Sequence, residues 1–349
     1  MQIIMDKKII FITVILILFA AGCTGGTRNK NEEVDVHVGF SGLAIEFLKN
    51  SPPAKVFEGD TLPVLIKVKN NGAYSITGDG AIVSLGVEKD YTDKLDLLKG
   101  GRISSFAGLN NAAVFSLDGK SPISPIGDEE VISYNLKAGK VDPQSEAHAS
   151  TVIATLCYPY ETILSSTVCI DTDINNLRTS KKVCSNKDLV FSNGQGAPVS
   201  VTKLEINMLP TISEKNTADK IKPQFLVYVE NKGQGTVIRN GAVKDFCTKS
   251  DASHEDLNIV YVDVELSGKK LECQLETKTD SSELGHIKLK DKKDIIRCSA
   301  VNIEEGSKAN YLTDIDRNQD PYLSPLKISL SYGYTQSISA NYFIQKPVS

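Results

Sequence analysis

The sequence lacks the residue clusters that mark nucleic-acid-binding surfaces, zinc sites and common hydrolases. Its 39 Lys and Arg residues are balanced by 43 Asp and Glu residues and are spread along the chain, which excludes the concentrated positive charge that binds nucleic acid. No CxxC pair is present, and no cysteine has a histidine at the usual ligand spacing, so zinc is not expected. No Gly-x-Ser-x-Gly segment supplies a nucleophile. We therefore expect neither an enzyme nor a resident cofactor.

Long apolar stripes with the 3.6-residue period of a helix are also missing. The chain instead carries short runs in which apolar and polar residues alternate, separated by Gly, Asn, Asp and Pro. In the run at residues 62–69, for example, Val64, Ile66 and Val68 share one face of an extended chain. The pattern predicts an all-β protein.

The longest apolar run lies near the N-terminus, at residues 9–21, and is too short for a spanning helix, which needs roughly 20 residues. Two lysines precede it, and it ends in the small residues Ala20 and Ala21, with Gly22 next, as in a signal peptide. Their position before Cys23 resembles the lipobox of secreted lipoproteins, although a lipobox usually carries leucine where Ala20 stands. We predict a lipoprotein signal peptide at 1–22, a lipid on Cys23 and a flexible tether at 23–33. The alternative is an ordinary signal peptide with Cys23 as a free thiol or disulfide partner.

Six further cysteines favour disulfides, because an even number of cysteines outside the cytoplasm is usually paired. Cys157 and Cys169 would face each other if the chain formed a hairpin turning near Ile163. Cys273 and Cys298 lie in two strand-like runs and are expected to bond. Cys184 with Cys247 then follows by elimination. Reduced, buried cysteines are the alternative for all six.

An internal repeat predicts two similar units. The segment at 64–72 aligns without gaps on 225–233, and both end in an Asn-x-Gly turn. Later, the Tyr-x-Tyr segments at 158–160 and 332–334 correspond at an offset of 174, and each is expected to form a hairpin that ends its unit.

Each unit has the length of an immunoglobulin-like β-sandwich. We expect domain 1 at 34–172, a linker at 173–198 and domain 2 at 199–349. Residues 98–129, rich in Gly, Ser and Pro, are predicted to be a long loop excursion, either a functional loop or a variable surface insertion without a ligand.

One acidic segment is a candidate calcium site. Asp314, Asp316, Asn318 and Asp320 place oxygen-bearing side chains at alternate positions, as in a calcium loop. An EF-hand is excluded, because Gln319 replaces its glycine and Pro325 its bidentate glutamate. A solvated acidic loop is the alternative. The four histidines, His37, His148, His254 and His286, are scattered and are expected at the surface.

Several short motifs together resemble a known family. Two of them are the lipobox-like start and the Val-x-Asn-x-Gly strand ends at 68–72 and 229–233. The others are the Glu-Gly-Asp-Thr-Leu-Pro segment at 58–63, which leads into a strand, the predicted Cys157 hairpin and the Gly-Gln-Gly-Ala-Pro segment at 194–198. With them the chain resembles archaeal and bacterial envelope lipoproteins built from tandem cell-adhesion-related (CARDB-like) immunoglobulin-type domains. The resemblance implies adhesion or envelope scaffolding and brings no catalytic residues.

These observations predict a non-enzymatic protein outside the cytoplasm, anchored to the cell membrane by its N-terminal lipid. Membrane lipid would be one partner, through Cys23, and an unidentified surface protein or polysaccharide the other. The alternative function is a solute-binding or calcium-binding accessory lipoprotein of the envelope.

Overall fold

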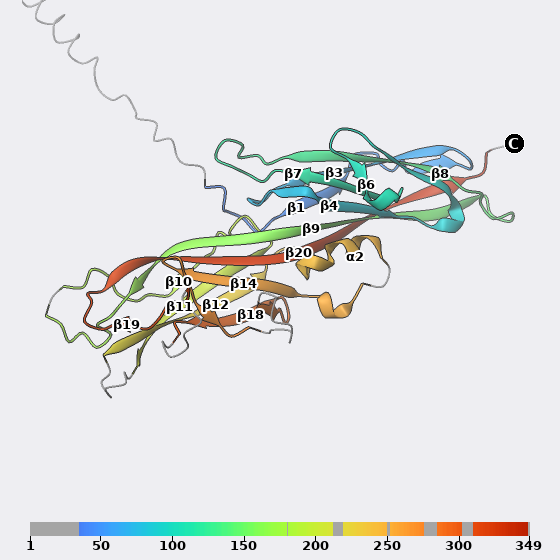
Figure 1. Ribbon diagram of the computed structural model, residues 1–349. Coiled ribbons are helices and arrows are strands. Elements are labelled where there is room, and N and C mark those ends of the chain that lie inside the picture. The colour runs from blue at the N-terminus through green and yellow to red at the C-terminus, as the bar shows by residue number, and fades with distance from the viewer. Residues whose placement is uncertain are drawn as a thin grey trace, which may run out of the picture. The chain divides into compact units, whose positions relative to one another are not determined.

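Figure 1 shows the computed structural model, which describes residues 35–179, 181–211, 219–249, 252–275, 285–301 and 310–347. Antiparallel strands make up nearly all the regular structure of these residues, which confirms the all-β prediction. The predicted signal peptide at 1–22, the lipidation site Cys23 and the tether at 23–33 lie outside the described residues. No helix among the described residues is long and apolar enough to cross a membrane.

Two small sheets repeat one arrangement, one formed by the first half of the sequence and one by the second half. In the first half the strand order is β1 (Leu43–Phe47), β3 (Thr61–Asn70), β8 (Glu129–Ala138) and β5 (Thr92–Leu98). In the second half it is β10 (Leu189–Val190), β11 (Val199–Thr211), β12 (Lys220–Asn231), β18 (Lys293–Ser299) and β16 (Glu272–Cys273), with β19 (Ile315–Asp316) beside β12.

A third sheet, of ten strands, runs through both halves (Figure 1). Its main path is β15 (Lys269–Lys270), β14 (Ile259–Leu266), β20 (Tyr322–Gln345), β9 (Ala147–Ile170), β4 (Ile76–Gly86), β7 (Ala112–Leu117) and β6 (Ser104–Ser105). Off this path, β2 (Lys55–Phe57) and β13 (Thr236–Ile238) pair with β20, and β17 (His286–Lys288) pairs with β14. The other elements are α2 (Val243–Thr248) and the 3₁₀ turns η1 (Lys89–Tyr91), η2 (Phe106–Gly108), η3 (Asn240–Ala242) and η4 (His254–Asp256).

The alternation seen in the sequence decides which face of each strand is buried. In β12 every second residue is buried, and β3 shows the same period. These side chains and those of the ten-stranded sheet form one apolar core that extends through both halves. Residues 35–349 group as one compact unit, and the domain boundaries expected at 172 and 199 stay a prediction.

The central feature is the pairing of β9 with β20, which we call the central ribbon. The two strands have 24 residues each and pair over their whole length, with Pro159 opposite Gly333. These two residues are themselves separated by the repeat offset of 174, so the ribbon has approximate two-fold symmetry about this point. Each half therefore meets the other around the Tyr-x-Tyr segments.

The same hydrogen bonds occur on both sides of this pseudo-two-fold axis. The Tyr158 hydroxyl accepts a bond from the Leu43 amide at 3.2 Å, and the Tyr332 hydroxyl accepts one from the Val199 amide at 3.2 Å. Both amides belong to residues that lie opposite the asparagine of an Asn-x-Gly turn. The repeat found in the sequence is thus matched by equivalent contacts.

The other two tyrosines of the ribbon hold the turns themselves. The Tyr160 hydroxyl accepts a bond from the Tyr74 amide at 3.3 Å, and the Tyr334 hydroxyl accepts one from the Gly235 amide at 2.8 Å. All four ribbon tyrosines are fully or almost fully buried on the face of the large sheet that packs against the small sheets. We call the opposite face, which carries Pro159, the back face.

The predicted hairpins at the two Tyr-x-Tyr segments are wrong. Each segment lies in the middle of an uninterrupted 24-residue strand. Flanking tyrosines that point into one core favour an extended chain here, and this outweighs the turn preference of Pro159.

The predicted loop at 98–129 is also wrong in part. It contains β6, η2 and the core strand β7, in which five of six residues are buried. Arg102 forms ion pairs with Asp128 and with Glu130, and these join the segment to the start of β8.

The segment predicted as a linker is held in place where it is described. Cys184 is bonded to Cys169, and Lys182 pairs with Asp171 at 2.8 Å. Residues 195–198 are buried, and the Gly196 carbonyl accepts a bond from the Tyr160 hydroxyl at 2.8 Å.

The buried tyrosines predict loss of the fold at high pH. Burial raises the pKa of Tyr158, Tyr160 and Tyr332 well above the usual value and that of Tyr334 to about 12. Tyrosines in the unfolded chain ionise at about pH 10, so the folded chain binds more protons between about pH 10 and 12. This contribution to stability is therefore complete below pH ~10 and is lost as the pH rises through that window. Circular dichroism against pH should show cooperative unfolding there, and a fold that stays intact above pH ~12 would contradict the prediction.

Candidate functional site

The clearest departure from the two-fold repeat is an insertion in the second half. In the first half β4 is one strand, whereas in the second half the corresponding stretch is divided into β13 and β14. Residues 239–258 lie between these strands and form η3, α2 and η4, apart from the undescribed residues 250 and 251. The insertion has no counterpart in the first half.

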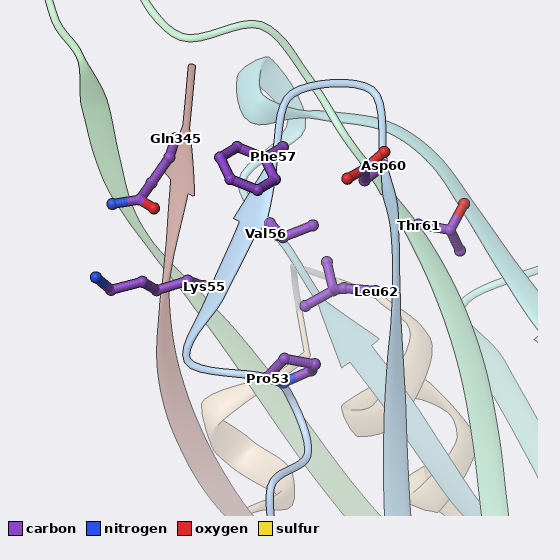
Figure 2. A pocket seen from close by; sticks show the side chains of 8 residues that line it. All are labelled: Pro53, Lys55, Val56, Phe57, Asp60, Thr61, Leu62 and Gln345. Carbon is purple, nitrogen blue, oxygen red and sulfur yellow. The ribbon is translucent and has the colours of Figure 1, made fainter. Parts of the chain in front are cut away.

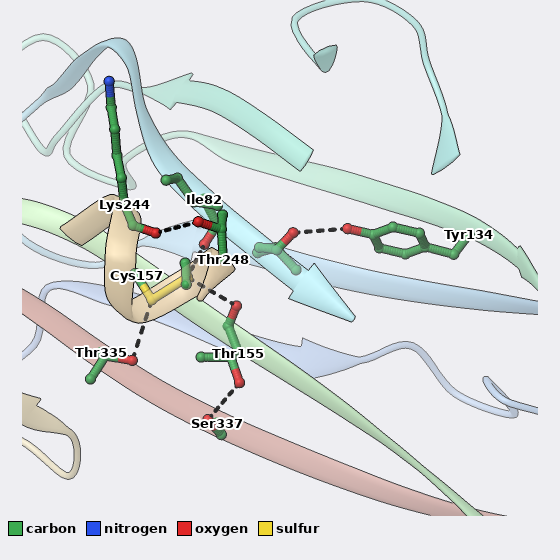
Figure 3. The surroundings of a disulfide bond; sticks show 10 residues. Ile82, Tyr134, Thr155, Cys157, Lys244, Thr248, Thr335 and Ser337 are labelled. Carbon is green, nitrogen blue, oxygen red and sulfur yellow. Dashed lines mark hydrogen bonds between the residues drawn. A yellow bond between two sulfur atoms is a disulfide. The ribbon is translucent and has the colours of Figure 1, made fainter. Parts of the chain in front are cut away.

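Helix α2 is fixed to the back face of the central ribbon (Figure 3). Cys247 on α2 forms a disulfide with Cys157 on β9, and both are buried. Val243 and Ile238 pack in the same small apolar cluster as Ile82 of β4. The second half thus reaches across the pseudo-two-fold axis and contacts the first.

A segment of the first half approaches the insertion from the other side. Strand β6 and turn η2 carry Ser104, Ser105 and Phe106, and the Lys244 ammonium lies 6.0 Å from the centre of the Phe106 ring. The next residue, Ala107, has a φ of 45°, which is uncommon for a residue with a side chain. The backbone is therefore strained where it turns toward α2.

These two segments border a cleft of about 550 Å³ on the back face, which we call the junction cleft. Its apolar wall includes Ile82, Val114 and Pro159. Polar groups come from Ser104 and Ser105 on one side, Asn240 and Lys244 on the other, and Asp79 in an irregular part of β4. Apolar walls with a few polar groups are typical of ligand sites, which often lie where two structural units meet. No pattern in the sequence indicates this site, because its lining comes from segments far apart in the chain.

A second hollow, of about 560 Å³, lies at the end of the first half (Figure 2). It is bordered by β2, the start of β3 and the end of β20, with Phe57 46% exposed at its side. Unlike the junction cleft, it uses no residue of the second half's insertion. We therefore take the junction cleft as the candidate functional site.

Three of the four predicted calcium ligands have other partners in the structure, and the calcium site stays a prediction. Asp314 accepts a bond from the Thr211 hydroxyl at 2.8 Å, and Asp316 accepts one from the Asn318 amide at 2.8 Å. Asp320 instead pairs with the Arg178 guanidinium at 3.2 Å.

Arg178 also contacts the backbone of this loop. Its guanidinium donates to the Gln319 carbonyl at 2.6 Å and to the Arg317 carbonyl. Across the described residues, no group of three or more His, Cys, Asp or Glu side chains is placed to hold a metal ion.

The histidines are placed differently from one another. The ring of His148 stacks on Tyr91, and its Nε2 lies 2.9 Å from Glu88 Oε2. His286 is buried against Tyr261, so its predicted surface position is wrong.

All six cysteines of the described part form disulfides, but two predicted pairs are wrong. Cys273 bonds Cys298, the pair expected from their strands, whereas Cys157 bonds Cys247 and Cys169 bonds Cys184. Cys157 and Cys169 lie twelve positions apart in one uninterrupted strand, which separates them by up to roughly 40 Å at about 3.3 Å per residue. Disulfides in this number are typical of proteins outside the cytoplasm.

Comparisons with known proteins give no family. No family model and no curated protein matches the chain. Similar solved structures include the partial N-terminal region of the enterococcal surface protein, with 8% identity, coverage of 87% of this chain and 87% of that one, and a TM-score of 0.19. Another is the C-terminal domain of the Streptococcus pyogenes antigen I/II-family protein AspA, with 9% identity, coverage of 88% and 100%, and a TM-score of 0.20. A third is the B domain of a biofilm associated protein, with 8% identity, coverage of 84% and 72%, and a TM-score of 0.19. Because these TM-scores are very low, none of the three tells us what this chain does.

Proposed function

We propose that this chain is a non-enzymatic cell-surface protein that is held at the membrane by a lipid on Cys23 and acts in adhesion or envelope scaffolding through the junction cleft. The observation that carries the proposal is the cleft itself, in which the insertion of one half and a strained turn of the other form one binding surface. Its polar groups differ in kind and surround an apolar wall, an arrangement suited to binding by contact.

The fold supports this role because it presents the cleft rigidly. The central ribbon joins the two halves along 24 residue pairs, and the Cys157–Cys247 disulfide fixes α2 beside the cleft. A surface that is already ordered loses less conformational entropy when a partner binds.

The lipid anchor predicts a change in location without a change in fold. In cells that produce Cys23→Ser, the protein should move from the membrane fraction to the medium, because removal of the acylated sulfur removes the membrane contact. Fractionation and mass spectrometry of the mature chain measure location and lipid mass together. A Cys23→Ser protein that remains in the membrane fraction would count against the anchor.

Adhesion itself is tested with beads that carry the mature, disulfide-bonded protein. We expect such beads to attach to cells of the producing organism, and beads carrying the reduced and alkylated protein to attach far less. Equal attachment of both bead types would show that the folded surface has no part in contact.

A further inference from the structure

We infer that the junction cleft binds an uncharged sugar residue, such as one unit of a neutral envelope or extracellular polysaccharide. This inference rests on the proposed function and names the class of molecule that the site recognises.

The cleft is divided into an apolar and a polar part. Phe106 and Pro159 supply partly exposed carbon surface beside the buried Ile82 and Val114, and polar groups stand at both sides of it. A pyranose ring has the same division, with a face of C–H groups and an edge of hydroxyls. Such a ring can cover the apolar surface without burying a hydroxyl that lacks a hydrogen-bond partner, which would be costly.

The polar groups of the cleft are a mixture of hydrogen-bond donors and acceptors. Asp79 only accepts hydrogen bonds, Lys244 only donates them, and Asn240, Ser104 and Ser105 do both. A sugar hydroxyl is both a donor and an acceptor, so neighbouring hydroxyls can satisfy such a set. A phosphate or sulfate would leave the Asp79 carboxylate without a donor and repel it.

The charged groups of the cleft also favour a neutral ligand. One carboxylate and one ammonium line the cleft, so their charges cancel. The cleft therefore attracts neither anions nor cations strongly, which separates a neutral saccharide from a nucleotide, an acidic polysaccharide or a basic peptide.

The size and support of the cleft agree with this ligand. Its volume of about 550 Å³ lies within the usual range for small-molecule sites, which is roughly 300–1,000 Å³. The Cys157–Cys247 disulfide and the central ribbon keep its walls together in the absence of ligand.

Saturation-transfer NMR on the mature protein tests the inference with the methyl glycosides of glucose, galactose, mannose and N-acetylglucosamine, and with inorganic phosphate. We expect at least one glycoside to bind at millimolar concentration and phosphate not to compete. Asn240→Ala removes an exposed polar group, and Phe106→Leu removes the ring but keeps an apolar side chain. Each variant should weaken binding about tenfold, as expected for one lost hydrogen bond or one lost ring contact.

Matched controls come from the same face of the sheet, outside the cleft. Asn341→Ala and Phe343→Leu repeat the two changes at exposed positions of β20, and binding should stay within about twofold. Binding that phosphate competes away would overturn the neutral ligand in favour of an anion.

The absence of binding by every glycoside to the folded protein would overturn the inference, as would equal loss in the cleft and control variants. The bead assay separates this failure from failure of the proposed function. If the beads attach but no glycoside binds, the result supports adhesion and rules out the sugar ligand. If a glycoside binds but the beads do not attach, the result supports the sugar site and rules out adhesion.

Discussion

Replacing both Cys157 and Cys247 with alanine is expected to lower the free energy of unfolding by about 4–5 kcal/mol. This bond closes a loop of 90 residues, and the entropy that a cross-link removes from the unfolded chain grows with the logarithm of loop length. The same change also frees α2 from the central ribbon, so one wall of the junction cleft loses its support. Guanidinium denaturation followed by circular dichroism measures the loss.

The matched control is the pair of changes Cys169→Ala and Cys184→Ala. That bond closes only 15 residues, for which the same relation gives about 3 kcal/mol. Glycoside binding should also weaken in the first variant and persist in the second, because Cys184 lies outside the cleft. Equal loss of stability in the two variants, or a larger loss in the control, would show that loop closure does not govern the effect.

Gly72→Ala is expected to cost about 3 kcal/mol of stability, at the upper end of the effect of overfilling a packed core. A methyl group at this position would meet the Tyr160 hydroxyl, and would lie 2.5 Å from the Gly196 carbonyl oxygen and 2.7 Å from that of Ser41. The side chain and backbone there are fixed by hydrogen bonds, so they yield little. Gly233→Ala should act similarly, since its methyl group would meet the hydroxyl of Tyr334.

Gly86→Ala is the control, because the nearest atom to its added methyl group is 3.7 Å away. Its stability should change by less than about 0.5 kcal/mol. Tyr160→Phe removes the hydroxyl that the new methyl group of Gly72→Ala would meet. The double variant should therefore lose less stability than the sum of the two single changes. Simple additivity would mean that Gly72 and Tyr160 do not meet as described.

Local patterns in the sequence predicted the strands and turns well. The alternation in β3 and β12 and their Asn-x-Gly ends depend on neighbouring residues, and the structure has both. Strand β7 was missed because it is buried on both faces. Such a strand shows no alternation, and the Gly and Pro residues around it favour a loop.

The features that depend on distant residues could not be read from the sequence. A proline between two tyrosines is typical of a turn, and only the partner strand with Gly333 opposite Pro159 keeps the chain extended. Once β9 is straight, Cys157 cannot reach Cys169, and α2 brings Cys247 to it instead. The junction cleft joins residues near 79, 105 and 240, and no sequence pattern connects these three positions.

The pairing of the end of β20 constrains the order in which the two halves can fold. Its final residues, Phe343 to Gln345, pair with β2, and Tyr342 and Ile344 are buried in the core. The first half therefore includes a strand segment that follows the second half in the sequence. During synthesis the first half must wait, unfinished, until residues 342–345 have emerged, so it is completed only after most of the second half has been made.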